Sequence, residues 1–186
     1  KLSLTTRDIS DYDELMNLRI KILRENNIKM KDIEEVISTL SPLEGAEEFL
    51  YKMWQKFQCV ILSDTFYQFA MPLMKQLDYP TLFCHDLIID NDGFVAGYKL
   101  RMKDSKREAI KHFRALNFKT IATGDSYNDT TMLKEADAGI LFRPPQRVID
   151  DFPQFKVCTE YDQLFNAFVE YDKEVKKLIP NKLISE

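Results

Sequence analysis

The chain has 186 residues, of which 45% are hydrophobic and 30% charged, the balance of an ordinary globular protein with enough apolar side chains for a core. Its net charge of −4, without a dense Lys/Arg block, argues against nucleic-acid binding. No apolar stretch approaches the roughly 18–20 residues of a membrane span, and no signal peptide is visible. We therefore expect small-molecule partners, alone or with a metal ion, and no membrane association.

The first forty residues carry only helical patterns, which favours a small cap. Ser10 followed by Asp13 resembles a capping box, and apolar residues then recur at helical spacing to about Asn26. Two further helices are expected, at about 31–40 and 43–57.

From residue 59 onward the pattern changes to short apolar runs, which are typical of strands buried on both faces. These runs are Cys59–Leu62, Leu82–Cys84, Phe118–Ala122, Ala138–Phe142 and Val157-Cys158. Helices are expected after Thr65 to about Leu77, at about 104–116, at about 129–136 and in Tyr161–Leu178. Residues 86–89 and 94–100 flank Asn91-Asp92-Gly93, which predicts a β-hairpin. Pro144-Pro145 predicts a loop.

Strands that alternate with helices predict an α/β fold, a doubly wound, Rossmann-like parallel sheet with helices on both faces. We place the helical cap at residues 8–42 and the α/β core at 43–186.

The cysteines and histidines show no metal-ligand spacing. Cys59, Cys84 and Cys158 lie in strand-like runs without a C-x-x-C pair, so we expect buried, reduced thiols and a cytoplasmic location. His85 and His112 are isolated, so we expect both to be structural rather than zinc ligands.

The richest strand end is the segment Gly124-Asp125-Ser126-Tyr127-Asn128-Asp129. It puts Asp125 and Asp129 four positions apart on a tight turn that Gly124 allows. Hard carboxylate oxygens on a rigid turn suit Mg²⁺, which binds one or two carboxylates and keeps waters and phosphate oxygens. The alternative is a turn rich in helix-capping residues; the added Asn128 leads us to favour the metal site.

Two other positions are weaker signals. Ser63 ends a strand, where it could be a simple N-cap or could hold a phosphate with the neighbouring backbone N–H groups. Lys106 lies in the first turn of a helix, where a cation opposes the helix dipole, which suggests that it faces an anion. The sequence has no P-loop, no G-x-S-x-G elbow and no calcium-loop pattern.

A strand ending in Ser63-Asp64-Thr65, then a helix-borne Lys106, then G-D-x-x-N-D resembles the haloacid dehalogenase superfamily of phosphotransferases. More narrowly, the chain is similar to phosphoserine phosphatases and to the bacterial phosphoserine:homoserine phosphotransferases. The segments that carry this narrower resemblance are 6–9, 42–46, 62–67, 103–107, 124–132 and 152–155.

This resemblance implies Mg²⁺ as cofactor and assigns roles to four core residues. Ser63 would bind the phosphoryl group, and Lys106 would stabilise its charge. Asp125 would be a direct metal ligand, and Asp129 would support the metal site without binding the metal itself.

The resemblance also implies the substrate contacts. Phosphoserine would be the phosphoryl donor, with water or homoserine as acceptor, and a homodimer is a further expectation. Arg19 would pair with the substrate carboxylate, and Asn128 would contact the substrate. Asp64, also assigned to substrate binding, stands where many phosphoserine phosphatases have Gly, a variation that fits the phosphotransferase branch.

The family's first motif, D-x-[DE]-G-x, lies on a strand before the cap and supplies the nucleophilic Asp and the general acid/base. Because no such strand precedes the cap here, we expect an N-terminally truncated copy that lacks the central first strand of the sheet, is poorly stable alone and is inactive. The alternatives are a non-catalytic phosphate- or partner-binding module, and a phosphatase for another small phosphate ester.

Overall fold

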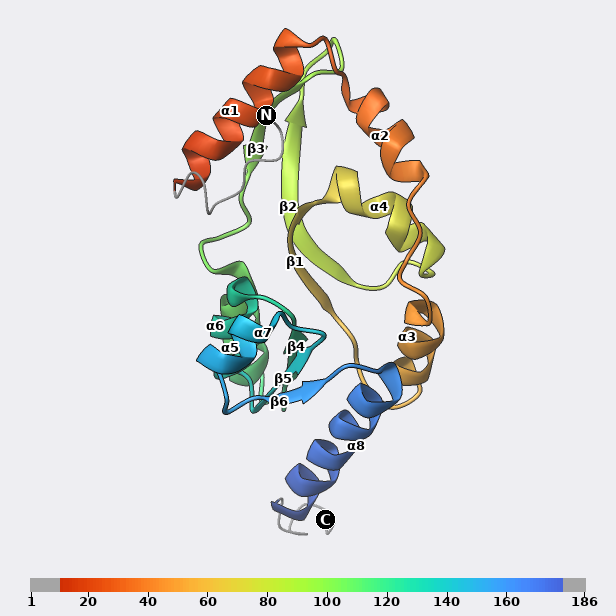
Figure 1. The fold of residues 1–186 in the computed structure, drawn as a ribbon, viewed down its shortest axis with the longest axis vertical. Helices are drawn as coiled ribbons and strands as arrows, with labels where there is room; N and C mark the ends of the chain where they lie inside the picture. Colours follow the sequence, from red (N-terminus) through yellow and green to blue (C-terminus); the bar gives the residue numbers. More distant parts are fainter. Residues whose placement is uncertain (1–10, 179–186) are drawn as a thin grey trace. The chain divides into compact units, whose positions relative to one another are not determined.

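The computed structural model describes residues 11–178 and is an α/β fold (Figure 1). Its helices are α1 (Tyr12–Glu25), α2 (Met30–Ser38), α3 (Ala46–Trp54), α4 (Tyr67–Gln76), α5 (Ser105–Ala115), α6 (Thr130–Glu135), α7 (Gln146–Asp151) and α8 (Tyr161–Leu178), with a 3-10 turn η1 (Tyr127–Asp129). Its strands are β1 (Ile61–Phe66), β2 (Leu82–Ile89), β3 (Val95–Lys99), β4 (Ile121–Gly124), β5 (Ala138–Phe142) and β6 (Lys156–Cys158).

The described residues form two compact units. Unit 1 contains the described residues up to Leu43 together with Cys59–Met102, and unit 2 contains Glu44–Gln58 and the described residues from Lys103 onward. Unit 1 thus combines the cap helices α1 and α2 with the first three strands.

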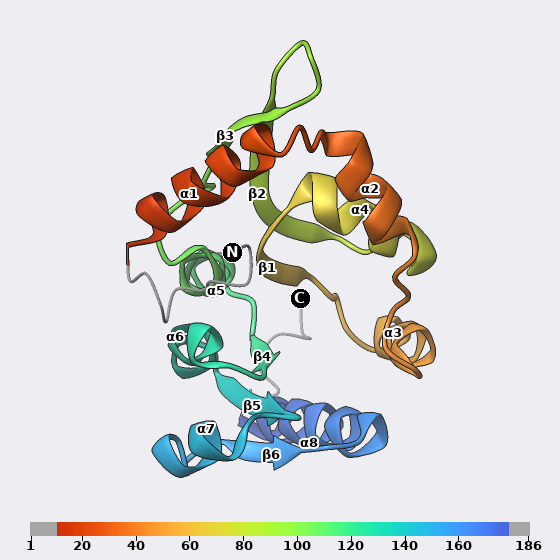
Figure 2. The same ribbon diagram turned by 45° about the horizontal axis from the view of Figure 1, so that its top comes forward.

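Unit 1 is built on a mixed sheet of order β1-β2-β3. Strand β2 is parallel to β1 in its first half and antiparallel to β3 in its second half. The predicted strand at 82–84 and the predicted hairpin strand at 86–89 are therefore one continuous strand. The hairpin itself is confirmed, and α1 lies along β3 (Figure 2).

The core of unit 1 joins the cap helices to this sheet. Met16 and Met30 pack with Phe66, Leu87 and Val95, and each is at most 7% exposed. Burial of one such side chain contributes about 1.5–3 kcal/mol, so the cap helices depend on the sheet for their stability.

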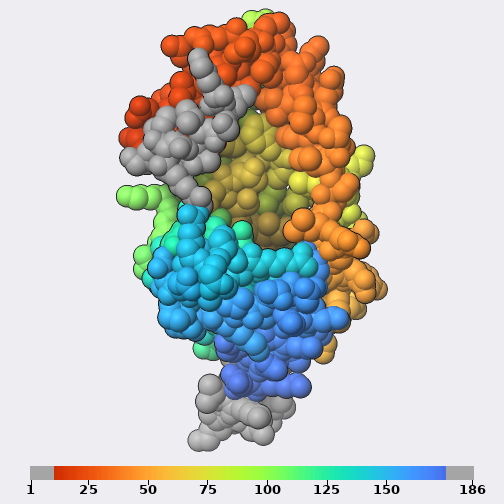
Figure 3. All heavy atoms as spheres, in the orientation of Figure 1, coloured from red at the N-terminus to blue at the C-terminus, as the bar shows by residue number. Residues whose placement is uncertain are grey.

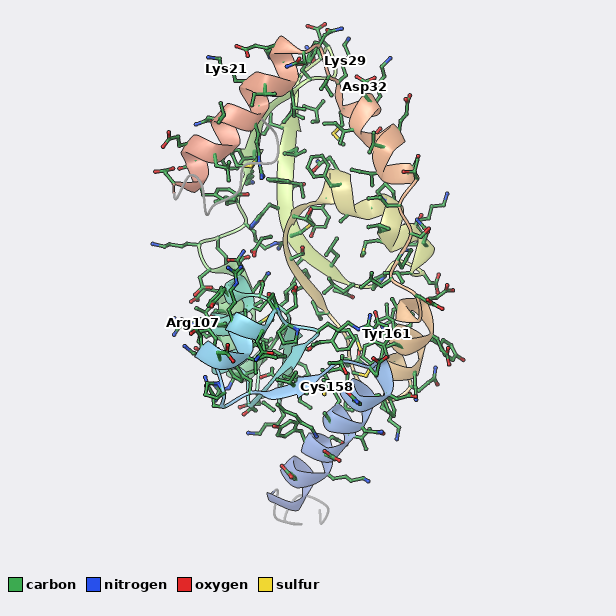
Figure 4. The ribbon with its side chains drawn as sticks, in the orientation of Figure 1. Lys21, Lys29, Asp32, Arg107, Cys158 and Tyr161 are labelled. Atoms are coloured by element: carbon green, nitrogen blue, oxygen red, sulfur yellow. The ribbon has the colours of Figure 1, made fainter. Side chains whose placement is uncertain are left out.

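The starts of the two cap helices are set by acidic caps. Helix α1 is capped by Asp11, whose carboxylate accepts the Glu14 N–H at 2.9 Å; Ser10, which we predicted as the cap, lies outside the described residues. Asp32 accepts the Lys29 N–H at 2.7 Å at the start of α2, where both side chains are labelled (Figure 4).

Unit 2 is built on a parallel sheet of order β4-β5-β6. Ile140 and Leu141 of β5 are fully buried, as expected for a central strand covered on both faces. Helix α3 packs on α8, where the Phe49 and Tyr161 rings stack at 4.8 Å; Tyr161 is labelled at the start of α8 (Figure 4). In the space-filling view the cyan and blue atoms of α7, β6 and α8 form one continuous block (Figure 3).

Two predictions about the elements need correction, and one helix was not predicted. The structure has two three-stranded sheets instead of one doubly wound sheet: β1 pairs only with β2 and β4 only with β5 among the described residues. Pro144 and Pro145 lie outside the helices and strands, as predicted, but α7 follows directly with Pro145 as its N-cap; the sequence did not predict this helix because six residues are too few to show a hydrophobic period. Helix α3 begins only at Ala46, after Gly45 with a left-handed φ of +79°.

The cysteines agree in part with the sequence prediction. Cys84 and Cys158 are buried and Cys59 is half-buried, and none of these described residues forms a disulfide. Burial raises the pKa of the Cys84 thiol to about 11, so it is a poor nucleophile. None of the described helices is both long and apolar enough to cross a membrane.

Candidate active site

The turn after β4 is organised by the buried carboxylate of Asp129. One of its oxygens, Oδ2, accepts the backbone N–H groups of Asp125 at 3.1 Å and Ser126 at 3.0 Å, and the Ser126 hydroxyl at 2.9 Å. These bonds fold the segment back onto itself and fix the Asp125 backbone at the end of the strand. Hydrogen bonds from several donors to one carboxylate are the strong, charge-assisted kind.

The other oxygen of Asp129 pairs with Lys106. Lys106 Nζ lies 2.9 Å from Asp129 Oδ1, and the two side chains are 12% and 9% exposed. Burial pushes the pKa of Asp129 up, but the hydrogen bond and charge of Lys106, helped by Ser126, hold it below the ordinary value. Lys106 therefore does face an anion, as its place in the first turn of α5 suggested.

Gly124 is required by this packing. A Cβ built at Gly124 would lie 2.4 Å from Asp129 Cβ, far inside any real contact. The strand end can approach the carboxylate this closely only because residue 124 has no side chain.

The turn offers Mg²⁺ an oxygen ligand, the carboxylate of Asp125. Asp125 is exposed at the strand tip and offers a carboxylate, whereas both oxygens of Asp129 are already engaged. Asp129 thus suits a supporting role better than direct coordination. No group of three His, Cys, Asp or Glu side chains within the described part of the chain is placed to hold a metal. Mg²⁺ bound at the Asp125 carboxylate would take waters and phosphate oxygens as further ligands.

Tyr127, in the middle of the motif, is a residue whose role the sequence did not reveal. Its hydroxyl donates to the Asp151 carboxylate, and its ring packs edge-on against Phe152 at 5.9 Å. The Arg147 guanidinium lies over the same ring, 5.6 Å from its centroid. Helix α7 and its flank thereby brace the turn, and only the tertiary packing shows it. Asn128, in the same turn, is exposed.

In unit 1, Ser63 and Asp64 lie inside β1 rather than after it, which corrects the predicted strand end. The register jumps from Leu62↔Phe83 to Phe66↔His85, so the segment between bulges out of the ladder. The Thr65 N–H donates to Ser63 Oγ at 3.3 Å, and the Asp64 side chain is 43% exposed.

Arg19 and Asp64 both lie within electrostatic reach of the Tyr12 hydroxyl. Burial raises the pKa of the Tyr12 hydroxyl, the negative charge of Asp64 raises it further, and the positive charge of Arg19 lowers it. Arg19 is half-buried on α1. A cation and an anion thus share one patch of unit 1.

His85, expected to be structural, is buried next to this patch. It is 5% exposed on β2, its Nδ1 accepts the Arg101 N–H at 3.1 Å, and its Nε2 lies 4.0 Å from Asp64 Oδ1.

One run, Asp90-Asn91-Asp92-Gly93, matches D-x-[DE]-G letter for letter, but it is the β2–β3 turn. Asp90 accepts the N–H groups of Asp92 at 3.1 Å and Phe94 at 2.9 Å and pairs with Arg24. These hydrogen bonds, the Phe94 N–H first and then Arg24, hold the pKa of Asp90 below its ordinary value. This aspartate closes a turn and is no candidate nucleophile.

Residues 8–137 match the family model of haloacid dehalogenase-like hydrolases, and the chain belongs to that family. It is 56% identical over 169 residues to the phosphoserine phosphatase ThrH of Pseudomonas aeruginosa, which covers 91% of this chain and 82% of that protein. A phosphoserine phosphatase of Pseudomonas syringae pv. tomato is equally similar, over 91% of this chain and 71% of its own length.

The fold is also found among solved structures. The crystal structure of a phosphoserine phosphatase in its apo form matches with a TM-score of 0.68 and 20% identity, over 83% of this chain and 78% of that one. A phospho-aspartyl intermediate analogue of phosphoserine phosphatase matches with a TM-score of 0.66 and 20% identity, over 80% and 72%. At this identity the likeness shows the fold.

Proposed function

We propose that this protein acts as a magnesium-dependent phosphoserine phosphatase that can also transfer the phosphoryl group to homoserine. The observation that carries the proposal is the buried Lys106–Asp129 pair, set behind the exposed Asp125 on a turn of the G-D-x-x-N-D form. The two Pseudomonas phosphoserine phosphatases, at 56% identity, support the choice of substrate.

We propose the following tasks for the residues of unit 2, and those of unit 1 are given separately. In unit 2, Asp125 would hold Mg²⁺, whose charge would offset that of the phosphoryl group. Asp129 fixes Lys106 and the Asp125 backbone, so the ammonium of Lys106 is held ready for an anion without reorganisation. Asn128, exposed in the same turn, would contact the substrate.

In unit 1, Ser63 would donate its hydroxyl to a phosphoryl oxygen, and Arg19 would pair with the substrate carboxylate through its planar fork. Asp64 is assigned to the same substrate. We keep residues 8–42 as the cap and 43–186 as the core, and we propose that the protein is a homodimer. We also propose a reducing, cytoplasmic location, because the described cysteines form no disulfide.

Covalent phosphoryl transfer also needs a nucleophilic carboxylate, which the family carries in D-x-[DE]-G-x on a central strand. The only run of that pattern among the 186 residues is the Asp90–Gly93 turn, whose Asp90 is already engaged. We therefore propose that these residues alone do not turn over phosphoserine.

The test is phosphate release from L-phosphoserine with Mg²⁺, on this chain and on a longer version preceded by a D-x-[DE]-G-x segment of the family. Turnover by the longer version alone supports both proposals. Turnover by the 186-residue chain refutes the proposal that these residues lack a nucleophile, and it supports the proposed phosphoserine phosphatase activity. Absence of turnover in both overturns the function and favours a binding module or another phosphate ester.

A further inference from the structure

We propose that His85 is a positioning residue that holds the Asp64 carboxylate for the ammonium group of the amino-acid substrate. This inference rests on the proposed function, because it assumes a substrate that carries both an ammonium and a carboxylate. It adds a residue that the motifs do not contain.

The first step is the proton on the His85 ring. Because the Arg101 backbone N–H donates to Nδ1 at 3.1 Å, that nitrogen presents a lone pair, and in the neutral ring the proton resides on Nε2. The ring itself is 5% exposed and lies beside the Phe66 ring at 6.1 Å, which leaves it little freedom to turn.

The second step is the direction of that proton. Nε2 lies 4.0 Å from Asp64 Oδ1, so the Asp64 carboxylate is the acidic group beside this N–H. The separation is longer than a hydrogen bond, and contacts at ligand-free sites are often long and shorten when the substrate binds. The Arg101 side chain secures the arrangement, because its Nη2 donates to the Tyr67 hydroxyl at 2.8 Å.

The third step is the chemistry of the patch. The half-exposed Asp64 carboxylate and the half-buried Arg19 guanidinium both act on the Tyr12 hydroxyl, so an anion and a cation lie near the same group. An amino acid carries the complementary pair of charges. If Arg19 takes the carboxylate, Asp64 is the matching partner for the ammonium, and its side chain is 43% exposed.

Two variants separate the functions of the two ring nitrogens. His85→Asn keeps an acceptor where Nδ1 stands and removes the Nε2 donor, whereas His85→Gln keeps a donor near the Nε2 position. His112→Asn is the matched control, because His112 is the other histidine of the chain and is exposed on α5.

Kinetics are measured in the form of the chain that turns over phosphoserine. We expect His85→Asn to raise the KM for L-phosphoserine about 5–10-fold with little change in kcat, and His85→Gln to stay within about 2-fold. Added to Asp64→Asn, His85→Asn should have no further effect, because it acts through that carboxylate. The analogue 3-phosphooxypropanoate, which lacks the ammonium group, should show no KM change in any of these variants.

Additive effects of the two substitutions, or an equal KM increase for the analogue, would overturn the inference. The imidazole tautomer gives a readout that needs no activity: nitrogen-15 NMR of the 186-residue chain, with only two histidines, should show His85 protonated on Nε2. Protonation on Nδ1 would overturn the inference even if phosphoserine is the substrate. Failure of turnover in the wild-type protein, with the Nε2 tautomer present, would instead count against the proposed function.

Discussion

Replacing Asp129 by Asn removes one charge and keeps the size of the side chain. The Asn amide has one oxygen, so it can accept either from Lys106 or from the Asp125 and Ser126 N–H groups, and its NH₂ then faces donors on the other side. Lys106, 12% exposed, loses its counter-charge. Breaking one partner of a buried pair typically costs 3–5 kcal/mol, and the remaining exposure lowers our expectation to about 3 kcal/mol.

The measurement is urea unfolding of the two proteins, followed by circular dichroism. Glu108→Gln is the control, because Glu108 forms an exposed pair with Lys111 on the same helix, and we expect no measurable change there. A loss below about 1 kcal/mol for Asp129→Asn would refute the claim that the pair organises the turn.

The acid dependence gives a second check on the same variant. Because the folded pKa of Asp129 lies below its unfolded value, the carboxylate contributes stability above the unfolded pKa of about 3.9 and loses it as the pH falls through the folded pKa. The stability difference between wild type and Asp129→Asn should therefore narrow below about pH 4. A difference that stays constant there would contradict the assignment.

Three further substitutions test other parts of the argument. Asp125→Asn should abolish the stimulation of phosphate release by Mg²⁺ in the active form, and retained stimulation would refute the metal assignment. Gly45→Ala should cost about 1 kcal/mol in urea unfolding, because φ is +79° and the new Cβ would lie 3.2 Å from the Tyr161 ring; an unchanged midpoint would contradict it. Thr123→Val should be neutral or stabilise by up to about 1 kcal/mol, because the buried Thr123 hydroxyl has no hydrogen-bond partner among the described residues, and a clear loss would show that the hydroxyl is used.

The short, strongly patterned elements could be predicted from the sequence alone. The apolar run of β5, the hairpin around Asp92-Gly93 and the long amphipathic helix from Tyr161 all agree with the structure. Their patterns are local: alternation, turn chemistry and a 3.6-residue period act within a few residues of each other.

The candidate active site was likewise predictable in part, where its residues are neighbours in the sequence. The Gly124-to-Asp129 segment could be recognised because its Gly and carboxylates are neighbours in the sequence, and the misfit of Lys106 in a first turn already pointed to an anion. That the anion is Asp129, 23 residues away, follows only from the packing of α5 against α6.

Other features depend on contacts between segments that are distant in the chain. The bulge at Ser63-Asp64 exists because β2 pairs with β1 in two registers, and no residue type marks it. His85 reads as one buried histidine in an apolar run until the fold places it beside Asp64 and Arg101. The sequence by itself determined the elements and the chemistry of the motif, because these depend on neighbouring residues. The tertiary structure alone decided which side chains form ion pairs and hydrogen bonds, because these depend on distances between strands and helices that no local pattern encodes.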